Sequence, residues 1–374
     1  MKLVADSGLW TLGPVSAESP LAAVLEVSGA VLSWTVDDPS GDGRARITFT
    51  DLSRTDWLWR VFGEAGHVAL AGAAAAMDGA TSIELTGVDI VAGSMDPLRR
   101  LAIGHWLRRW WPASRQDGIA GLDRALLDVE IALLTVGAQG FFTDDTLDSD
   151  AAELLAPHAA ALFTHVRSDD PRIADLVRAG AGLAEEIGVD DDAWAELLAV
   201  LDDSASKPAI PSGRRDDYAL AAGAGAGPGG ATEIARGVAA VNWTAVPPAI
   251  FDAGEDTVEW TVEAGVAAVV RAAIVGPDPA TGVPVRLQSG AVSGAGVLDG
   301  DGHATLPLLD AEARPMTESA AWDHDWSQTA VIVGADTAEP RDTRERIRRW
   351  VHARLDRPPA DAFLAEILAS ESAY

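Results

Sequence analysis

Apolar and polar residues alternate along the first part of the chain in a way typical of β-strands. Residues 21–36 are mostly apolar, and they end at a run of Asp, Pro, Ser and Gly at 37–43 that favours a turn. Alternation returns at 45–50 and 83–91, so we expect strands up to about residue 92. The alanine-rich stretch 67–76 is compatible with a helix or a strand.

Helical spacing replaces this alternation after residue 95. Asp96 and Pro97 are residue types favoured at the start of a helix. Apolar residues then recur every three or four positions, most clearly over 122–142. The pattern predicts an N-terminal α+β domain over residues 1–202, with strands up to about 92 and helices from about 96 to 201.

A segment poor in large side chains follows. Residues 203–232 carry two prolines early on, and 221–231 are almost entirely Ala, Gly and Pro. Such a stretch buries too little surface to offset its ordering entropy, which predicts a flexible linker. Its Gly-x-Gly-x-x-Gly match at 225–230 lacks the preceding apolar strand that a dinucleotide site needs, so we interpret it as part of the linker.

The remaining residues predict a second domain over 233–374. Turn residues recur at intervals of about 8–12 between 233 and 336, which is typical of a β-sandwich. The run 297–308 predicts a hairpin around Asp299 and Gly300. Helical spacing at 342–355 and 361–370 predicts terminal helices. The fold class is therefore α+β, an N-terminal strand-then-helix domain followed by a β-sandwich-like domain with terminal helices.

Residues 283–309 resemble a known type of module. The run Pro284-Val285-Arg286-Leu287 and the hairpin at 297–308 are together similar to the prealbumin-like modules found as carboxypeptidase regulatory domains. The resemblance implies a β-sandwich fold and a binding or spacer role. It supplies no active-site residue and no cofactor.

Composition narrows the function further. The chain has no cysteine, which excludes disulfides, thiolate metal sites and cysteine nucleophiles. A net charge of −29 repels nucleic acid and anionic membranes, so we expect neither as a partner. No apolar run is long enough to span a membrane and no secretory signal is expected, which predicts a cytoplasmic location. The bias towards Ala, Gly, Asp and Arg is typical of a GC-rich bacterium.

Residues 322–326, Trp-Asp-His-Asp-Trp, form the most suggestive cluster for chemistry. In an extended conformation Trp322, His324 and Trp326 would share one face and Asp323 and Asp325 the other. A carboxylate beside an imidazole suits acid–base or metal chemistry, which makes His324, Asp323 and Asp325 the candidate catalytic residues. A loop in which the tryptophans pack and the aspartates face water accounts for the same sequence.

Other patterns favour structural roles. His158 and His165 lie seven residues apart on one predicted helix face, and two ligands are too few for a zinc site. The acidic run at 299–310 has Ala304 where a calcium loop needs glycine. We therefore expect no metal site and no cofactor.

The arginine-rich segment 341–357 predicts a docking helix. Its apolar residues Ile347, Trp350, Val351 and Leu355 form one stripe, which is costly to leave in water. We expect this stripe to dock on the same chain with its arginines facing acids, with docking on a partner as the alternative. The candidate partner-binding residues are Trp322, Trp326, Arg348, Arg349 and Trp350.

The hypothesis favoured by the sequence is a non-catalytic cytoplasmic bacterial interaction or scaffold (adaptor) protein of a multi-protein system, with a protein partner. The alternative is a metal-assisted hydrolase that uses the cluster at 322–326.

Overall fold

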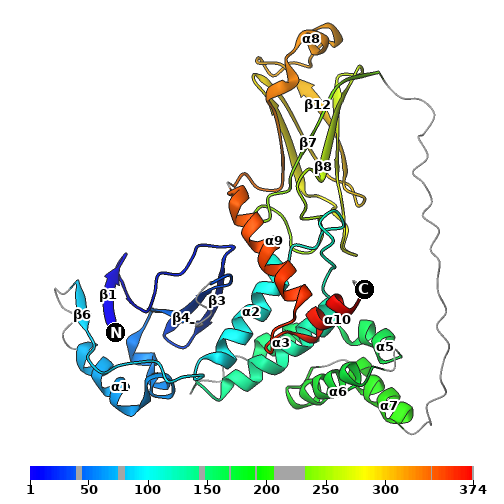
Figure 1. Ribbon diagram of the computed structural model, residues 1–374. Coiled ribbons are helices and arrows are strands. Elements are labelled where there is room, and N and C mark those ends of the chain that lie inside the picture. Colours follow the sequence, from blue (N-terminus) through cyan, green and yellow to red (C-terminus); the bar gives the residue numbers. More distant parts are fainter. Residues whose placement is uncertain are drawn as a thin grey trace. The chain divides into compact units, whose positions relative to one another are not determined.

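The computed structural model divides the chain into two compact units (Figure 1). It describes residues 1–38, 44–74, 81–142, 148–167, 170–189, 192–205, 232–337 and 339–372. Unit 1 comprises Met1–Trp111, Leu122–Leu201 and Pro340–Tyr374, and unit 2 comprises Pro112–Gly121 and Asp202–Glu339. The predicted linker lies, apart from its ends at 203–205 and 232, outside the described residues.

Unit 1 begins with an antiparallel sheet. Within the described residues its six strands lie in the order β3-β4-β5-β2-β1-β6. They are β1 Lys2–Asp6, β2 Leu9–Leu12, β3 Ala22–Val27, β4 Ala30–Thr35, β5 Arg46–Phe49 and β6 Ser82–Glu84. The apolar run predicted as a strand at 21–36 forms two strands, β3 and β4, and alternate residues of β4, such as Leu32 and Trp34, are buried. The strand expected at 83–91 ends early, because a turn follows in which Gly87 has a φ of 72°.

Helices make up the rest of unit 1. The bounds are η1 Leu52–Arg54, η2 Asp56–Leu58, α1 Trp59–Ala74, α2 Asp96–Trp110, α3 Arg124–Gln139, α4 Asp148–Leu155, α5 Ala159–Val166, α6 Pro171–Glu186, α7 Asp192–Ala205, α9 Arg341–Asp356 and α10 Leu364–Ser372. The ambiguous stretch 67–76 is helical up to Ala74. α3 begins where the Asp123 carboxylate accepts a hydrogen bond from the Leu126 amide at 3.0 Å.

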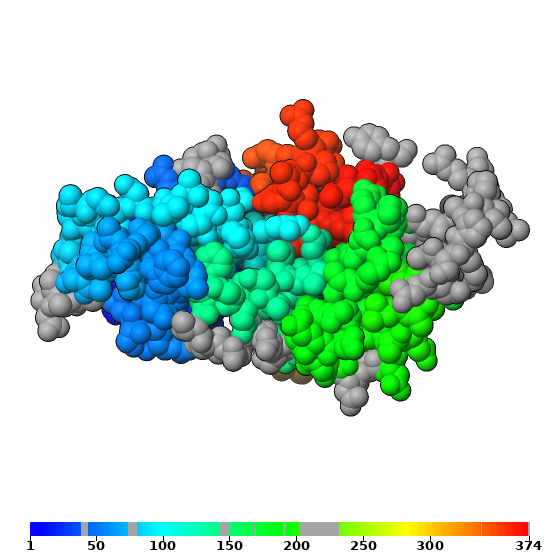
Figure 2. Space-filling model, turned by 90° about the horizontal axis from the view of Figure 1, so that it is seen from below, coloured from blue at the N-terminus to red at the C-terminus, as the bar shows by residue number. Residues whose placement is uncertain are grey.

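The C-terminal helices belong to unit 1, whereas the sequence had assigned them to the second domain. Figure 2 shows the red C-terminal segment against cyan and green segments of this unit. Ile347 and Val351 of α9 are fully buried, and Arg354 donates to Glu366 of α10 at 2.6 and 2.8 Å. Docking on the same chain with arginines facing acids is thus confirmed, and these helices are grouped with the N-terminal residues in unit 1. An apolar stripe in the sequence shows that a helix must pack against something, but it does not identify the surface that the helix packs against.

Unit 2 is a sandwich-like antiparallel sheet. Its seven strands in the described residues follow the order β13-β10-β11-β12-β9-β8-β7, and the outermost strands β13 and β7 approach each other. The bounds are β7 Glu233–Ala239, β8 Val258–Glu263, β9 Ala267–Ala272, β10 Pro284–Ser289, β11 Val292–Val297, β12 His303–Leu309, α8 Glu318–Asp323, η3 Trp326–Gln328 and β13 Thr329–Val333. The predicted hairpin joins β11 and β12, and the α+β fold class is confirmed.

None of the helices in the described ranges combines the length and apolar character that crossing a membrane requires.

Candidate binding site

The cluster at 322–326 does not form the extended segment that the sequence suggested. α8 ends at Asp323, and His324 is its C-cap residue. Asp325 then caps η3, where its carboxylate accepts a hydrogen bond from the Ser327 amide at 2.9 Å. The chain therefore bends within the cluster. Trp322 is 51% exposed and Trp326 is buried, so the two tryptophans do not share a face.

His324 is held by structural contacts. Its Nε2 lies 3.0 Å from Ser289 Oγ, which also accepts a hydrogen bond from Thr329 Oγ1 at 3.0 Å. Ser289 is 0% exposed, so its hydroxyl is not open to a substrate. The imidazole also packs edge-on against Trp326, with ring centroids 4.5 Å apart. These contacts fasten the α8–η3 segment to the end of β10.

The two aspartates of the cluster contribute no converging ligand set. Hydrogen bonds from Ser327 lower the pKa of Asp325, which stays an ionised capping residue, and Asp323 is exposed. Within the described residues, no group of three His, Cys, Asp or Glu side chains is placed to hold a metal ion. The geometry therefore gives no observation that favours metal-assisted hydrolysis at His324.

The other candidate partner-binding residues differ in their exposure. Arg348 is buried in α9, and Trp350 is half-buried against Trp106, with ring centroids 5.0 Å apart. Arg349 is exposed on the same helix. Of the five candidates, only Trp322 and Arg349 are exposed in this chain.

The two histidines of the 158–165 pair bind an acid within α3 and the acid that caps its start. His158 Nε2 lies 2.8 Å from Asp128 Oδ2, and His165 Nε2 lies 2.7 Å from Asp123 Oδ2. Asp128 is 0% exposed and also accepts a hydrogen bond from Arg108 Nε at 2.9 Å. These pairs tie α5 and α2 to α3, which is a structural role.

A cavity of about 600 Å³ in unit 2 was not anticipated from the sequence. One wall is the short segment Pro112–Gly121, which separates α2 from α3 in the sequence but packs in unit 2. Ser114 and Ile119 exchange backbone hydrogen bonds of 2.9 and 2.8 Å across this segment, and the Ala253 amide donates to the Ala113 carbonyl at 3.0 Å. The wall is therefore fixed to the strand-connecting segment that precedes β8.

Asp252 completes this attachment. It is 3% exposed, and its two carboxylate oxygens accept hydrogen bonds from the amides of Arg115 and Gly254, each at 2.9 Å. A side chain on Gly254 would have no room, because a Cβ there would lie 2.9 Å from Ser114 Oγ. The carboxylate thus places Arg115 at the cavity without entering an ion pair with its guanidinium.

The opposite wall comes from the sheet. His303 of β12, Arg271 of β9 and Glu259 of β8 are successive cross-strand partners, and their exposed side chains lie on one face. Asp256 and Asp301 complete the acidic lining. Sequence spacing gives no signal for this site, because Arg115 and Arg271 lie in segments that only the fold brings together.

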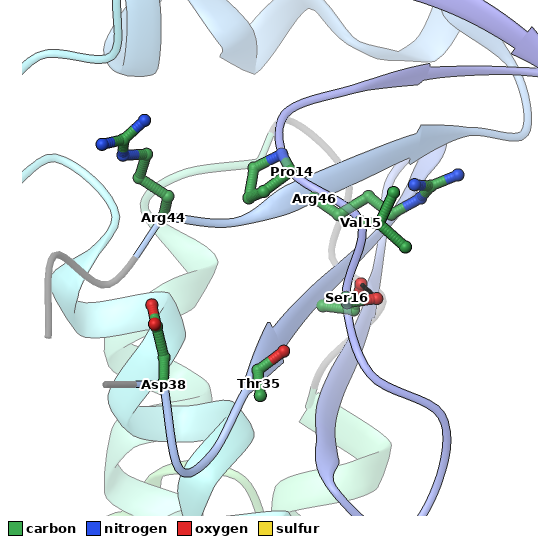
Figure 3. Close-up of a pocket in the computed structure, with 8 residues that line it drawn as sticks. Pro14, Val15, Ser16, Thr35, Asp38, Arg44 and Arg46 are labelled. Carbon is green, nitrogen blue, oxygen red and sulfur yellow. Dashed lines mark hydrogen bonds between the residues drawn. The ribbon is translucent and has the colours of Figure 1, made fainter. Parts of the chain in front are cut away.

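A second pocket, of about 330 Å³, lies in unit 1 beside β4 and β5. Ser33 Oγ donates to Ser16 Oγ at 2.9 Å, and Arg46 is paired with Asp6 at 2.6 Å. Figure 3 shows Arg44 and Arg46 pointing to opposite sides of this pocket. Arg44 borders the segment 39–43, which the structure does not describe, and we assign no role to this pocket.

Comparison of the chain with known protein families, with curated proteins and with solved structures found no match.

Proposed function

We propose that the protein is a non-catalytic cytoplasmic bacterial interaction protein, an adaptor of a multi-protein system, and that Trp322 is its main docking residue. The observation that carries this proposal is that the Trp322 side chain is 51% exposed, on a helix whose neighbouring residue Ala321 is fully buried. Tryptophan is enriched among the residues that dominate binding energy at protein interfaces. Within the described part of unit 2, the other large apolar side chains exposed to this degree are Val238 and Val297.

The support beneath Trp322 is rigid. Ala321 is fully buried, and its carbonyl accepts a hydrogen bond from Trp326 Nε1 at 2.9 Å. At the start of α8 the Thr317 hydroxyl accepts a hydrogen bond from the Ala320 amide at 3.3 Å. Because the helix is already fixed in the free chain, docking on Trp322 would cost little ordering entropy.

The surroundings of Trp322 indicate the chemistry of the partner. Glu318, Asp323 and Asp325 are exposed around it, and the whole chain carries a charge of −29. A basic partner segment would gain ion pairs with these carboxylates and a cation–π contact with the indole. The same charge supports a protein partner over nucleic acid, for which we expect no binding tighter than about 10 μM at physiological salt.

The test compares Trp322→Ala with Trp59→Ala in full-length protein. Trp59 is also 51% exposed but lies in unit 1, so its removal is a matched loss of exposed indole. A partner captured from the host should be retained by the Trp59 variant and lost by the Trp322 variant. With the purified partner, Trp322→Ala should raise the Kd by at least about tenfold. Equal affinity of the two variants would contradict the proposal.

A further inference from the structure

We propose that the cavity of unit 2 binds a small zwitterionic ligand, an amino acid or a short peptide. In this arrangement the ligand carboxylate lies against Arg115 and Arg271, and its ammonium group lies against the acidic lining. This inference does not depend on Trp322, which is not among the residues that line the cavity.

The two arginines are the first argument. Among the described residues, neither the Arg115 nor the Arg271 guanidinium has an ion-pair or hydrogen-bond partner, although the chain carries 57 acids against 28 Lys and Arg. Glu259 lies directly opposite Arg271 in the β8–β9 pairing, and still the two side chains form no ion pair. Guanidinium groups left open in one cavity match the planar, two-oxygen geometry of a carboxylate.

The acids of the cavity are the second argument, because they select against a simple anion. The Asp252 carboxylate is already used by two backbone amides. The exposed carboxylates of Asp256, Glu259 and Asp301 remain in the lining. Three carboxylates beside two guanidiniums disfavour a ligand that is only negative. A zwitterion pairs with both the guanidiniums and the carboxylates. The imidazole of His303, which also lines the cavity, is a further hydrogen-bonding group.

Size and rigidity are the third argument. A volume of about 600 Å³ is within the range of small-molecule pockets, roughly 300–1,000 Å³. The Arg115 side is fixed by the buried Asp252 carboxylate and the Arg271 side by the β8–β9 pairing. Both guanidiniums therefore extend from backbone that is ordered before any ligand arrives, which reduces the entropic cost of binding.

The experiment is calorimetric titration of the full-length protein with the twenty amino acids and with their glycyl dipeptides as separate arms. Each ligand that binds would then be titrated as its N-acetylated and its C-amidated analogue. We expect at least one zwitterion to bind with a Kd of about 1 mM or tighter. Both blocked analogues should bind at least about tenfold more weakly, because each lacks one of the two charges.

Variants locate the site. Arg271→Gln and Arg115→Gln should each weaken binding by about tenfold or more, and Glu259→Gln should weaken it by removing an ammonium partner. Arg349→Gln is the matched control, since it removes an exposed arginine of α9 outside the cavity. Trp322→Ala should bind the ligand as the parent protein does, which separates this inference from the proposed function.

Three results would overturn the inference. The first is that no amino acid or dipeptide binds. The second is that a ligand binds the Arg271 variant as tightly as the parent protein. The third is that inorganic phosphate binds more tightly than every zwitterion, which would make the cavity a general anion site.

Discussion

Phe363 should be the residue on which the docking of the C-terminal helices depends most. Its side chain is 0% exposed, and it packs against α2 where Gly104 leaves space, since a Cβ on Gly104 would lie 2.7 Å from the Phe363 ring. The Arg100 guanidinium lies over the same ring at 5.1 Å. Phe363→Ala would leave a cavity enclosed by α2 and α3, which are fixed to each other and have little freedom to collapse.

The expected loss is about 3–5 kcal/mol of the free energy of unfolding, the usual cost of removing a buried phenylalanine. For a unit of about 225 residues, each kcal/mol lowers the Tm by about 2–4 °C, so the Tm of unit 1 should fall by about 6–20 °C. Differential scanning calorimetry of the full chain measures this. Trp59→Ala, which removes a half-exposed ring from the same unit, is the control. A fall no larger than that of the control would refute the assigned packing.

Three further predictions follow from the two units. Asp128→Ala removes the buried carboxylate shared by Arg108 and His158, and chemical denaturation should show a loss of about 3–5 kcal/mol; a loss below 1 kcal/mol would contradict the burial. Burial raises the pKa of Glu130 above 4.5, although the Leu364 amide and Arg100 act against this. Because its pKa is raised on folding, Glu130 contributes stability below pH 4.5, and this contribution is lost as the pH rises through the folded-state pKa. In Glu130→Gln the free energy of unfolding should therefore change less with pH over that interval. A pH dependence equal to that of the parent protein would contradict the prediction. Limited proteolysis should cut first within 203–232, yet the two fragments should elute together in size exclusion, because α9 and α10 pack in unit 1; separate fragments would contradict this.

The sequence was informative wherever structure depends on near neighbours. The apolar run at 21–36 predicted a strand where β3 and β4 lie, and the helical spacing in 122–142 predicted α3. The turn at Asp299 was also readable, and its carboxylate accepts hydrogen bonds from the amides of Asp301 and His303. These signals lie within a few residues of each other, so a single sequence displays them.

Contacts between segments far apart in the sequence could not be predicted from the sequence. Residues 112–121 stand between two helices of unit 1, and nothing in their composition indicates that they pack in unit 2. The cavity depends on this segment, so its residues could not be recognised together. In the 322–326 cluster, by contrast, local signals were present. Thr317 and Asp325 are both residue types that favour N-caps, and they indicate a bent segment in place of a strand.

The buried arginines of α9 bear on the shape in which the C-terminal segment docks on unit 1. Arg344, Arg348 and Arg354 are each less than 10% exposed, although an apolar stripe alone would dock on many apolar surfaces. A buried guanidinium is tolerated only where acceptors meet it, and Glu366 meets Arg354 with both carboxylate oxygens. The Phe363 amide donates to the same carboxylate at 2.9 Å, which links this ion pair to the ring that fills the space at Gly104.

We infer that this ion pair fixes α9 and α10 relative to each other, while the apolar stripe supplies the driving force for docking on unit 1. The fragments of proteolysed protein test this, because α9 and α10 are, together with Pro112–Gly121, the segments through which the fragments hold each other. Glu366→Gln keeps the shape of the side chain but removes its charge, leaving Arg354 buried beside Asp361 at 3.8 Å. If docking were driven by the apolar stripe alone, the cut protein would stay associated as firmly with this substitution as without it. If the charge sets the position, the fragments should separate at a lower denaturant concentration.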